Sequence, residues 1–281
     1  MKKYEKYIEK LLFVSATVSI LSVLLITIFI FKEGVEFFSK NNLLSFLMGT
    51  NWAPTKGSFG ILPMIVGSLL VTLGALILGI PIGLGCAIYM AELSNPKLRN
   101  FLKPIIELLA GIPSVVYGFF GLLILVPFIR ERFGGVGFSV LSGSIILAIM
   151  ILPTIISISE NAIRSVPDDF KKASLSLGAS HWETIKFIVL PAARSGIIAA
   201  IILGMGRAIG ETMAVIMVTG NVPKIPTGIL SPVRTLTGGI ALEMGYASGM
   251  HQKSLFAMGV VLFVIIMLLN SIANLFPKES R

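Results

Sequence analysis

The segment SVPDDFKKASLSLGASHWETIKFIVLP, residues 165–191, lies between strongly apolar stretches, yet it carries acidic and basic residues in both halves. Its opening SVPD places a capping serine, Ser165, before a proline and an acid, which predicts that a helix begins here. Gly178 is typical of the left-handed residue that ends a helix. Ser180 and Glu183 have the spacing of a capping box, which predicts a second helix up to the closing proline. We therefore expect a helical hairpin.

The composition places the rest of the chain in a membrane. Hydrophobic residues make up 55% and charged residues 13% of the 281 residues, and the mean hydropathy is +0.91. These values exclude an ordinary soluble domain and indicate a polytopic membrane protein. The net charge is +9, but the basic residues are scattered between apolar runs, which argues against nucleic-acid binding. The chain has a single cysteine, so it has no intrachain disulfide.

Apolar runs of about 20 residues or more predict six membrane-spanning helices. The fold class is therefore an all-α polytopic membrane protein with both termini on the same side. If the N-terminus is inside, the inner segments hold 13 basic residues in 58 positions and the outer ones 8 in 75. This bias predicts cytoplasmic termini and a cytoplasmic hairpin in a multi-pass protein of the plasma or inner membrane. We expect the spans at residues 11–31, 63–90, 104–128, 140–160, 194–219 and 255–275.

Small and helix-breaking residues predict how the spans pack and bend. Gly79 and Gly83 form a G-x-x-x-G pair that lets a neighbouring helix approach closely. The GIP sequence that begins at Gly111 predicts a break in the third span. Residues 220–254 are too long for a plain turn and are expected to contain a short helix over the outer mouth. His251 in this segment has no second histidine or acid at ligand spacing, so we expect no metal site.

The fifth predicted span carries an arginine and a glutamate. Arg207 and Glu211 are four residues apart, which predicts one helical face, with Gly206 and Gly210 opening a slot beside them. Arg207 would lie roughly 16 Å along the helix, near mid-bilayer, where a charge costs at least about 2.5–3.5 kcal/mol. The two charges could neutralise each other and lock a helix interface. Alternatively, Arg207 binds a phosphate-like anion with its planar fork, and Glu211 holds or releases that arginine.

The hairpin resembles the loop by which membrane subunits of ATP-binding cassette (ABC) importers dock in a groove of their ATPase. That loop has the pattern E-A-A-x-x-x-G, then nine residues, then I-x-L-P. The spacing agrees throughout, although a lysine replaces the acid and a serine replaces the second alanine. The resemblance implies that the following residues couple this chain to an ATPase: Lys172, Ala173, Ser174, Leu177, Gly178, Ile188, Leu190 and Pro191.

A wider resemblance covers the chain from about Trp52 to the last span. The sequence GRAIGETMA at residues 206–214 is the most discriminating stretch, and ELLAGIPSVVYG at 107–118 and IYMAE at 88–92 support it. These stretches are similar to the C-type permease subunit of bacterial and archaeal phosphate importers, the Pst system. The resemblance maps the family's intramembrane charged pair onto Arg207 and Glu211.

The resemblance also implies an architecture and partners. It implies an N-terminal part at residues 1–62 and a type I ABC importer permease core at residues 63–276, which includes the coupling hairpin 165–191. The implied partners are a homologous A-type permease in a heterodimer, two copies of a cytoplasmic ATPase and an external phosphate-binding protein. Inorganic phosphate is the implied substrate, and no cofactor or metal is implied.

Two other functions remain open from the residues alone. Arg207 would serve another oxyanion, such as phosphonate, molybdate or sulfate, equally well. The charged residues could also line an ATP-independent channel or secondary transporter, although the chain has no convincing inverted halves. An enzyme is not expected, because no catalytic set converges. The chain also lacks the G-x-x-x-x-G-K-[ST] phosphate loop, so a separate subunit must hydrolyse ATP.

Overall fold

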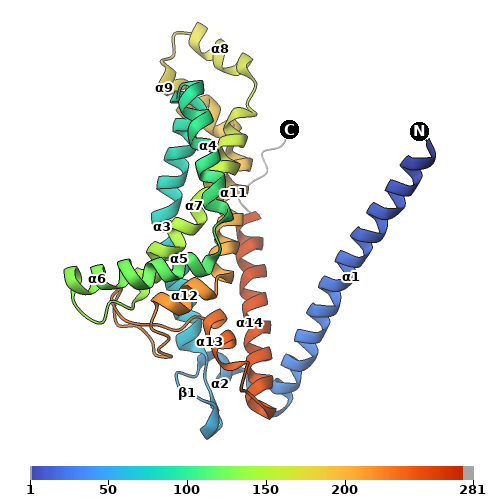
Figure 1. The fold of residues 1–281 in the computed structure, drawn as a ribbon, viewed down its shortest axis with the longest axis vertical. Helices are drawn as coiled ribbons and strands as arrows, with labels where there is room; N and C mark the ends of the chain where they lie inside the picture. The colour runs from blue at the N-terminus through green and yellow to red at the C-terminus, as the bar shows by residue number, and fades with distance from the viewer. Residues whose placement is uncertain (1, 275–281) are drawn as a thin grey trace.

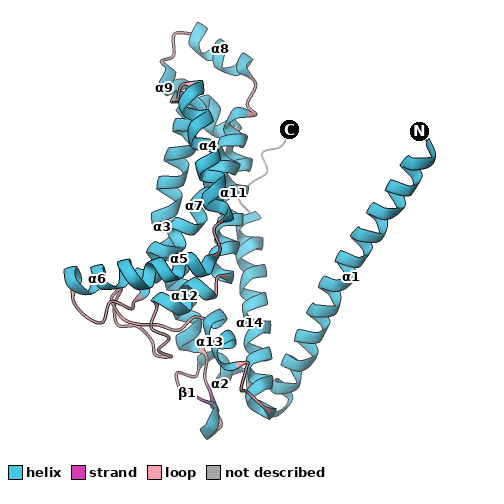
Figure 2. Cartoon of the chain, viewed as in Figure 1, coloured by secondary structure: helices cyan, strands magenta, loops and turns pink. Residues whose placement is uncertain are grey.

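The structure is a computed structural model that describes residues 2–274, with side-chain positions for residues 6–271. This part of the chain is almost entirely helical, with a small antiparallel sheet at one end (Figure 2). The elements in chain order are α1 (Lys2–Lys40), α2 (Leu43–Met48), β1 (Trp52–Ala53), η1 (Pro54–Lys56), β2 (Ser58–Phe59), α3 (Leu62–Ile88), η2 (Tyr89–Leu93), α4 (Pro96–Gly111), α5 (Ser114–Phe120), η3 (Gly121–Leu125), α6 (Val126–Phe133), α7 (Val140–Arg164), α8 (Asp168–Ser176), α9 (His181–Thr184), η4 (Ile185–Val189), α10 (Leu190–Ala192), α11 (Arg194–Gly210), α12 (Met213–Val218), α13 (Leu236–Glu243) and α14 (Gly249–Asn274).

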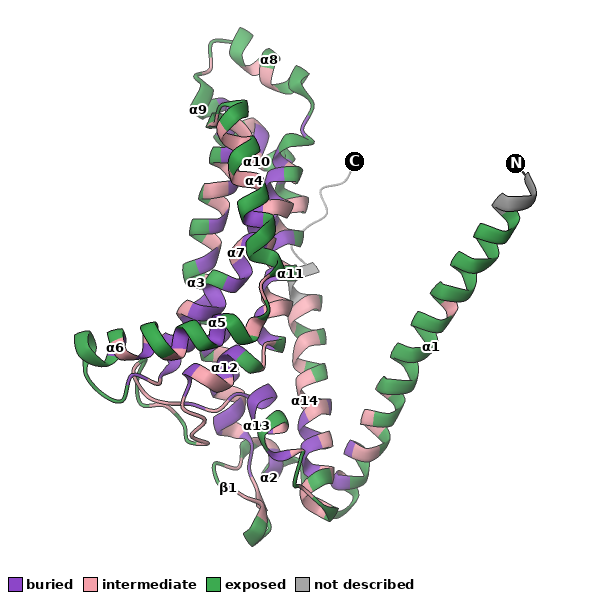
Figure 3. Ribbon diagram, viewed as in Figure 1, coloured by how far each residue is buried: buried purple, intermediate pink, exposed green. Residues whose placement is uncertain are grey.

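The centre of the molecule is the pair α3 and α7, and α11 packs against both (Figure 1). Helix α7 is the most buried long helix of the bundle (Figure 3). The G-x-x-x-G prediction is confirmed at this contact. A Cβ atom at Gly79 would lie 2.9 Å from Ile151 Cδ1, and one at Gly83 would lie 2.8 Å from Ile155 Cγ2. The two helices are close because both positions lack side chains.

The membrane character predicted from composition is confirmed by the helices. Within residues 2–274, five helical stretches are long and apolar enough to cross a membrane, and a bent pair makes a sixth. The bent pair joins His181–Ala192 to Arg194–Gly210 at 69°. The five continuous stretches are Lys6–Lys40, Leu62–Leu93, Ser114–Phe133, Val140–Arg164 and Gly249–Ser271.

The predicted boundaries of the third span were wrong. Residues 104–128 do not form one helix, because α4 ends at Gly111 and α5 begins at Ser114. The GIP sequence makes the predicted break, and the hydroxyl of Tyr117 donates across it to the carbonyl of Leu109 at 2.8 Å. Helices α5 and α6 then lie across the bundle instead of continuing along it (Figure 1). A proline has no N–H to continue the helical ladder, which explains the break.

The terminal helices are longer than the predicted spans 11–31 and 255–275. Helix α1 covers Lys2–Lys40, because the polar residues that flank its apolar run are helical as well. Helix α14 begins at Gly249. Residue 275, and with it the predicted end of the permease core at 276, lies outside the described residues.

Helix α1 diverges from the bundle towards its N-terminus, while its other end packs on α14 (Figure 1). Edge-on aromatic pairs form this contact, such as Phe29 with Phe256 at a centroid distance of 5.4 Å. The rest of α1 presents exposed apolar side chains (Figure 3), for example Phe13, which is 71% exposed. Such a surface suits lipid or a neighbouring membrane helix rather than water.

Candidate functional site

The candidate substrate path lies where the fifth predicted span is broken. Helix α11 ends at Gly210, and α12 begins at Met213, so residues 194–219 are not one helix. Glu211 has extended backbone angles, φ −67° and ψ 134°. Its carboxylate accepts hydrogen bonds from the backbone N–H groups of Thr212 at 3.0 Å and Ala214 at 3.2 Å. The carboxylate therefore satisfies free donors at the start of α12, as an N-capping group does.

The predicted common helical face of Arg207 and Glu211 is wrong for this reason. Arg207 is in the last turn of α11, whereas Glu211 lies beyond the end of that helix. Among the described residues, no ion pair joins Arg207 to a carboxylate. The interpretation that the two charges neutralise each other is therefore contradicted. Arg207 is half-buried.

The predicted slot beside this pair stays a prediction, although the space next to both glycines is open in the chain. A Cβ atom at Gly206 or Gly210 would meet no other atom within 4 Å. The hydroxyl of Thr237 in α13 donates to the backbone carbonyl of Glu211 at 2.8 Å. The break is therefore held by a tertiary contact, with an open face on the side of the two glycines.

The hairpin at 165–191 forms largely as predicted. Gly178 has a left-handed φ of +86° and separates α8 from α9. The capping box is complete: the Glu183 N–H donates to the Ser180 hydroxyl at 3.3 Å, and the Ser180 N–H donates to the Glu183 carboxylate at 2.7 Å. The second half then continues through η4 and α10, past Pro191 to Ala192.

One prediction for the hairpin was wrong. Ser165 does not begin the first helix, because α7 continues to Arg164 and Ser165 is its C-terminal cap. The Ser165 hydroxyl donates back to the carbonyl of Ala162 at 2.7 Å. Helix α8 instead begins at Asp168, after Pro167. The long apolar face of α7 carries its helix further than the local cap signal indicated.

The predicted coupling residues lie on both halves of the hairpin. Leu177 is 89% exposed, and Gly178 has no neighbour within 4 Å of its Cβ position. The hydroxyls of Ser174 and Thr184 are 3.0 Å apart and join the halves. The remaining predicted positions are exposed at Lys172, Ala173 and Pro191 and half-buried at Ile188 and Leu190. The hairpin therefore presents an uncovered apolar tip at one end of the molecule (Figure 1).

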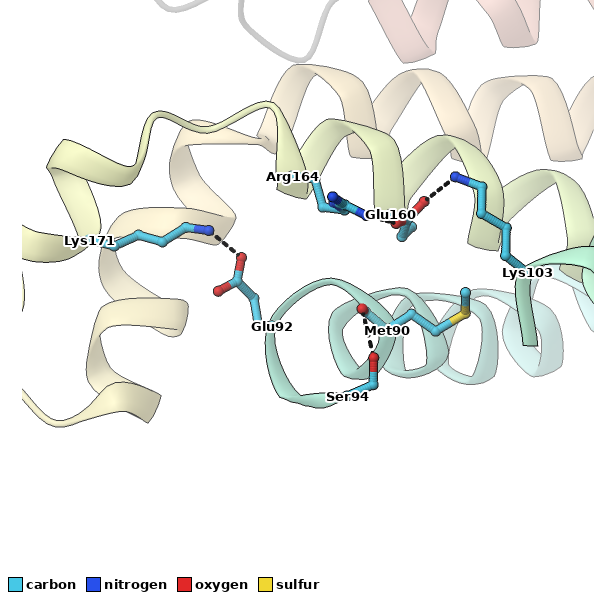
Figure 4. A network of polar contacts seen from close by, with 7 residues as sticks. All are labelled: Met90, Glu92, Ser94, Lys103, Glu160, Arg164 and Lys171. Atoms are coloured by element: carbon cyan, nitrogen blue, oxygen red, sulfur yellow. Dashed lines mark hydrogen bonds and ion pairs between the residues drawn. The ribbon is translucent and has the colours of Figure 1, made fainter. Parts of the chain in front are cut away.

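Buried acids meet basic residues just below the hairpin, as Figure 4 shows. The ammonium group of Lys171 in α8 lies 2.8 Å from Glu92 Oε1 in η2. Glu160 of α7 lies between Lys103 at 3.2 Å and Arg164 at 3.3 Å. The side chains of Glu92 and Glu160 are 5% and 1% exposed. The first contact joins the hairpin to η2, and the others join α4 to α7.

A second polar cluster, the outer cluster, lies at the end of the bundle opposite the hairpin (Figure 1). Its centre is the buried carboxylate of Glu243 at the end of α13. Trp52 donates its indole N–H to this carboxylate at 3.0 Å, Arg234 forms an ion pair with it, and His251 lies 2.7 Å from it. The Arg234 Nε–H also donates to the carbonyl of Asn221 at 2.9 Å. A cavity of about 490 Å³ opens beside these side chains.

Sequence reasoning missed this cluster. The predicted short helix in 220–254 exists as α13, but its terminal acid pairs with residues from three other segments. His251 does have an acid partner, eight residues earlier, although neither residue belongs to a metal-type cluster in the described part of the chain. A useful signal was the isolated Glu243 in an otherwise apolar stretch, because a buried charge requires a partner.

Comparisons with known proteins place the chain in a transport family. The family described as "Binding-protein-dependent transport system inner membrane component" matches residues 79–280. The probable ABC transporter permease protein YqgH of Bacillus subtilis is 42% identical over 89% of this chain and 83% of that protein. The phosphate transport system permease protein PstC of Mesorhizobium japonicum is 38% identical over 82% of this chain and 77% of its own length.

Solved structures share the fold at low sequence identity. A membrane chain of the inward-facing MetNI methionine ABC transporter aligns with a TM-score of 0.62 and 19% identity, over 80% of this chain and 96% of that one. A chain of a bacterial ABC transporter for the acidic polysaccharide alginate aligns with a TM-score of 0.61 and 17% identity, over 92% and 96%. At such identities the likeness concerns the fold alone.

Proposed function

Because the chain belongs to the family of binding-protein-dependent transport system inner membrane components, and so is the permease subunit of an ABC importer, we propose that its substrate is inorganic phosphate. The observation that carries this proposal is the similarity to permeases named for phosphate transport, at 38% and 36% identity over most of the chain. The type I importer fold of the structural neighbours supports the same architecture.

Arg207 is the residue that we propose binds the phosphate in the path. A guanidinium donates two parallel hydrogen bonds to phosphate oxygens and stays protonated when it loses water. The half-buried Arg207 has no carboxylate partner among the described residues, and the open face at Gly206 and Gly210 gives an anion room to approach. Glu211 acts differently from the arginine: its bonds to α12 fix the break that presents Arg207 to the path.

The hairpin is the segment that we propose couples transport to ATP hydrolysis. Its apolar tip at Leu177 is exposed and would bury its side chain in a groove of an ATPase subunit. In this mechanism, nucleotide binding closes two ATPase copies, draws the paired hairpins together and turns the path from inward-open to outward-open. Phosphate then enters from an external binding protein. The second half of the path comes from a homologous A-type permease.

The proposed mechanism requires a defined orientation in the inner or plasma membrane. The hairpin and both termini lie in the cytoplasm, in agreement with the excess of basic residues in the inner segments. The outer cluster then faces the exterior, at the opposite end of the bundle (Figure 1). Cysteine labelling tests this orientation: a cysteine at Leu177 should react only with reagents that reach the cytoplasm.

Reconstitution tests the function. The chain is co-purified with its second permease and ATPase, placed in proteoliposomes with the external binding protein, and supplied with labelled phosphate and ATP. We expect uptake that requires ATP and that unlabelled phosphate competes for better than sulfate, molybdate or phosphonate. Stronger competition by another oxyanion would show that this oxyanion, and not phosphate, is the preferred substrate. Uptake that persists without ATP and without the ATPase would replace the importer mechanism by a channel or secondary carrier.

A further inference from the structure

Helix α8 has little to hold it in place. None of its residues from Asp168 to Ser176 is buried, so α8 contributes no fully buried side chain to the apolar core of the bundle. Residues that lack buried contacts move easily unless polar contacts restrain them. A segment that transmits motion to the substrate path requires such a restraint, because a helix without firm contacts would move without displacing the bundle.

Two polar contacts restrain α8. The Ser174 hydroxyl lies 3.0 Å from the hydroxyl of the buried Thr184, which ties α8 to the second half of the hairpin. Lys171 contacts Glu92, which ties α8 to the end of α3. The two charged atoms are 2.8 Å apart, and their side chains are 21% and 5% exposed. The same lysine lies 3.7 Å from Asp168, but that acid is 77% exposed and belongs to α8 itself. An exposed pair within one helix contributes little, whereas a close pair with a buried partner is strongly coupled. Within the described residues, the Lys171–Glu92 pair is therefore the ion pair that ties α8 to an element outside the hairpin.

Glu92 belongs to a firmly closed turn. It lies in η2, which continues α3, and the turn closes by a bond from Ser94 N–H to the Tyr89 carbonyl at 2.8 Å. The Ser94 hydroxyl also donates to the Met90 carbonyl at 2.9 Å (Figure 4). Met90 is 2% exposed and packs with Ile106 and Ile156. Any displacement of α8 that keeps the ion pair thus acts on the end of α3.

Helix α3 leads directly to the candidate path. It packs along α7 and against α11, the helix that carries Arg207. The other buried acid at this end, Glu160, is already held by Lys103 and Arg164, which belong to α4 and α7. Glu92 is therefore the buried acid at this end of the described chain that reaches the hairpin itself (Figure 4).

We propose that Glu92 and Lys171 are positioning residues that fasten α8 to the inner end of α3, so that movement of the hairpin is transmitted to the α3, α7 and α11 core. This inference rests on the proposed function, because it assigns the ion pair to the coupling of ATP hydrolysis with transport. It predicts that, when the ion pair is broken, the ATPase still hydrolyses ATP but hydrolysis no longer drives phosphate transport efficiently.

The test uses the complete assembly in proteoliposomes and compares Glu92→Gln, Lys171→Gln and the exchanged pair Glu92→Lys with Lys171→Glu. The first readout is the number of phosphate ions delivered per ATP hydrolysed. We expect each single variant to lower this ratio roughly tenfold, while ATP hydrolysis itself continues. The exchanged pair should recover at least about half of the ratio, because it restores opposite charges at the same contact. Continued ATP hydrolysis in the single variants separates coupling from a merely structural role, because a loss of folding would lower hydrolysis as well.

The second readout is hydrogen exchange of the α8 amides in the isolated chain, which does not depend on transport. Exchange should rise roughly tenfold in both single variants and return towards the wild-type rate in the exchanged pair. Asp168→Asn is the matched control, because it removes the exposed acid from the same lysine; exchange and transport ratio should both stay within about twofold. Unchanged exchange in the single variants, or an exchanged pair no better than they are, would overturn the inference. If the wild type shows no ATP-driven uptake, the proposed function is overturned instead. The hydrogen-exchange measurement would then still decide whether the ion pair holds α8 in place.

Discussion

The outer cluster and the break between α11 and α12 differ in whether their charged side chains have partners. In the outer cluster, the carboxylate of Glu243 is buried and contacts Trp52, Arg234 and His251. At the break, Arg207 is half-buried and pairs with no carboxylate in the described part of the chain. A buried charge that is fully partnered holds elements together, whereas a charge left without a partner is available to a ligand. The difference agrees with a structural role for the first region and with the binding role proposed for the second.

The largest expected effect is on stability, at the outer cluster. Glu243→Ala leaves the Arg234 charge and the Trp52 N–H without their common partner, so we expect the free energy of unfolding to fall by about 3–5 kcal/mol. The measurement is denaturant unfolding of the purified chain in detergent. Glu36→Ala is the control, because this acid pairs with Lys253 but is 46% exposed, so its loss should lower the free energy of unfolding much less than the loss of Glu243. Equal losses in the two variants would remove the distinction between the regions.

The second effect is on transport, at the helix break. Arg207→Ala should reduce ATP-dependent phosphate uptake at least about 100-fold with little change in stability, since the arginine has no carboxylate partner to leave behind. Arg207→Lys keeps the charge but not the planar fork and should lose roughly tenfold. Arg194→Ala, at the exposed start of the same helix, should stay within about twofold. Normal uptake in both Arg207 variants at normal protein levels would end the assignment of this residue to the path.

The hairpin also contains both side chains without contacts and side chains whose hydrogen bonds are complete. Leu177 is left open at 89% exposure, so Leu177→Asp should not affect folding but should reduce phosphate delivered per ATP roughly tenfold, through lost contact with the ATPase. The reconstituted assembly provides the measurement. Asn100→Asp adds the same charge at an exposed position of α4, at the same end of the molecule, and should have no effect. If both variants behave alike, added charge and not the tip of the hairpin is responsible.

The smallest effect is expected at the capping box, where side chains of the hairpin form hydrogen bonds with its own backbone. Ser180→Ala removes the hydroxyl of the capping box and should destabilise α9 by about 1 kcal/mol, seen as faster hydrogen exchange at residues 181–189. Ser176→Ala is the control, since that hydroxyl only bonds back to the Lys172 carbonyl at 2.8 Å and should matter by a few tenths of a kcal/mol at most. An effect of Ser176→Ala as large as that of Ser180→Ala would refute the capping argument.

Local chemistry made several features predictable. The left-handed Gly178, the Ser180 capping box and the break after Gly111 depend on backbone geometry and on neighbours within a few residues. Ser165 shows the limit of such signals, because its cap chemistry was present but the packed face of α7 continued the helix up to it. Packing over a long helix outweighs a cap, which is worth about 1 kcal/mol.

Distant contacts decided what local spacing could not. The spacing of Arg207 and Glu211 indicated a helical pair, but the helix ends between them, where Thr237 donates to the Glu211 carbonyl at 2.8 Å. The outer cluster joins Trp52 to Glu243, which lie 191 positions apart in the sequence. Neither contact produces a periodic pattern of residues in the sequence, so neither could be inferred from hydrophobic patterns.

The sequence by itself determined that this chain is an all-helical membrane protein with a charged hairpin between apolar helices, because transfer of side chains from water and local helix signals act over short stretches. Only the tertiary structure decided which charges are paired. Ion pairs and hydrogen bonds need atoms within about 3 Å of each other, and the folding of distant segments brings Glu92 to Lys171 and Glu243 to Arg234, while Arg207 has no carboxylate partner among the described residues.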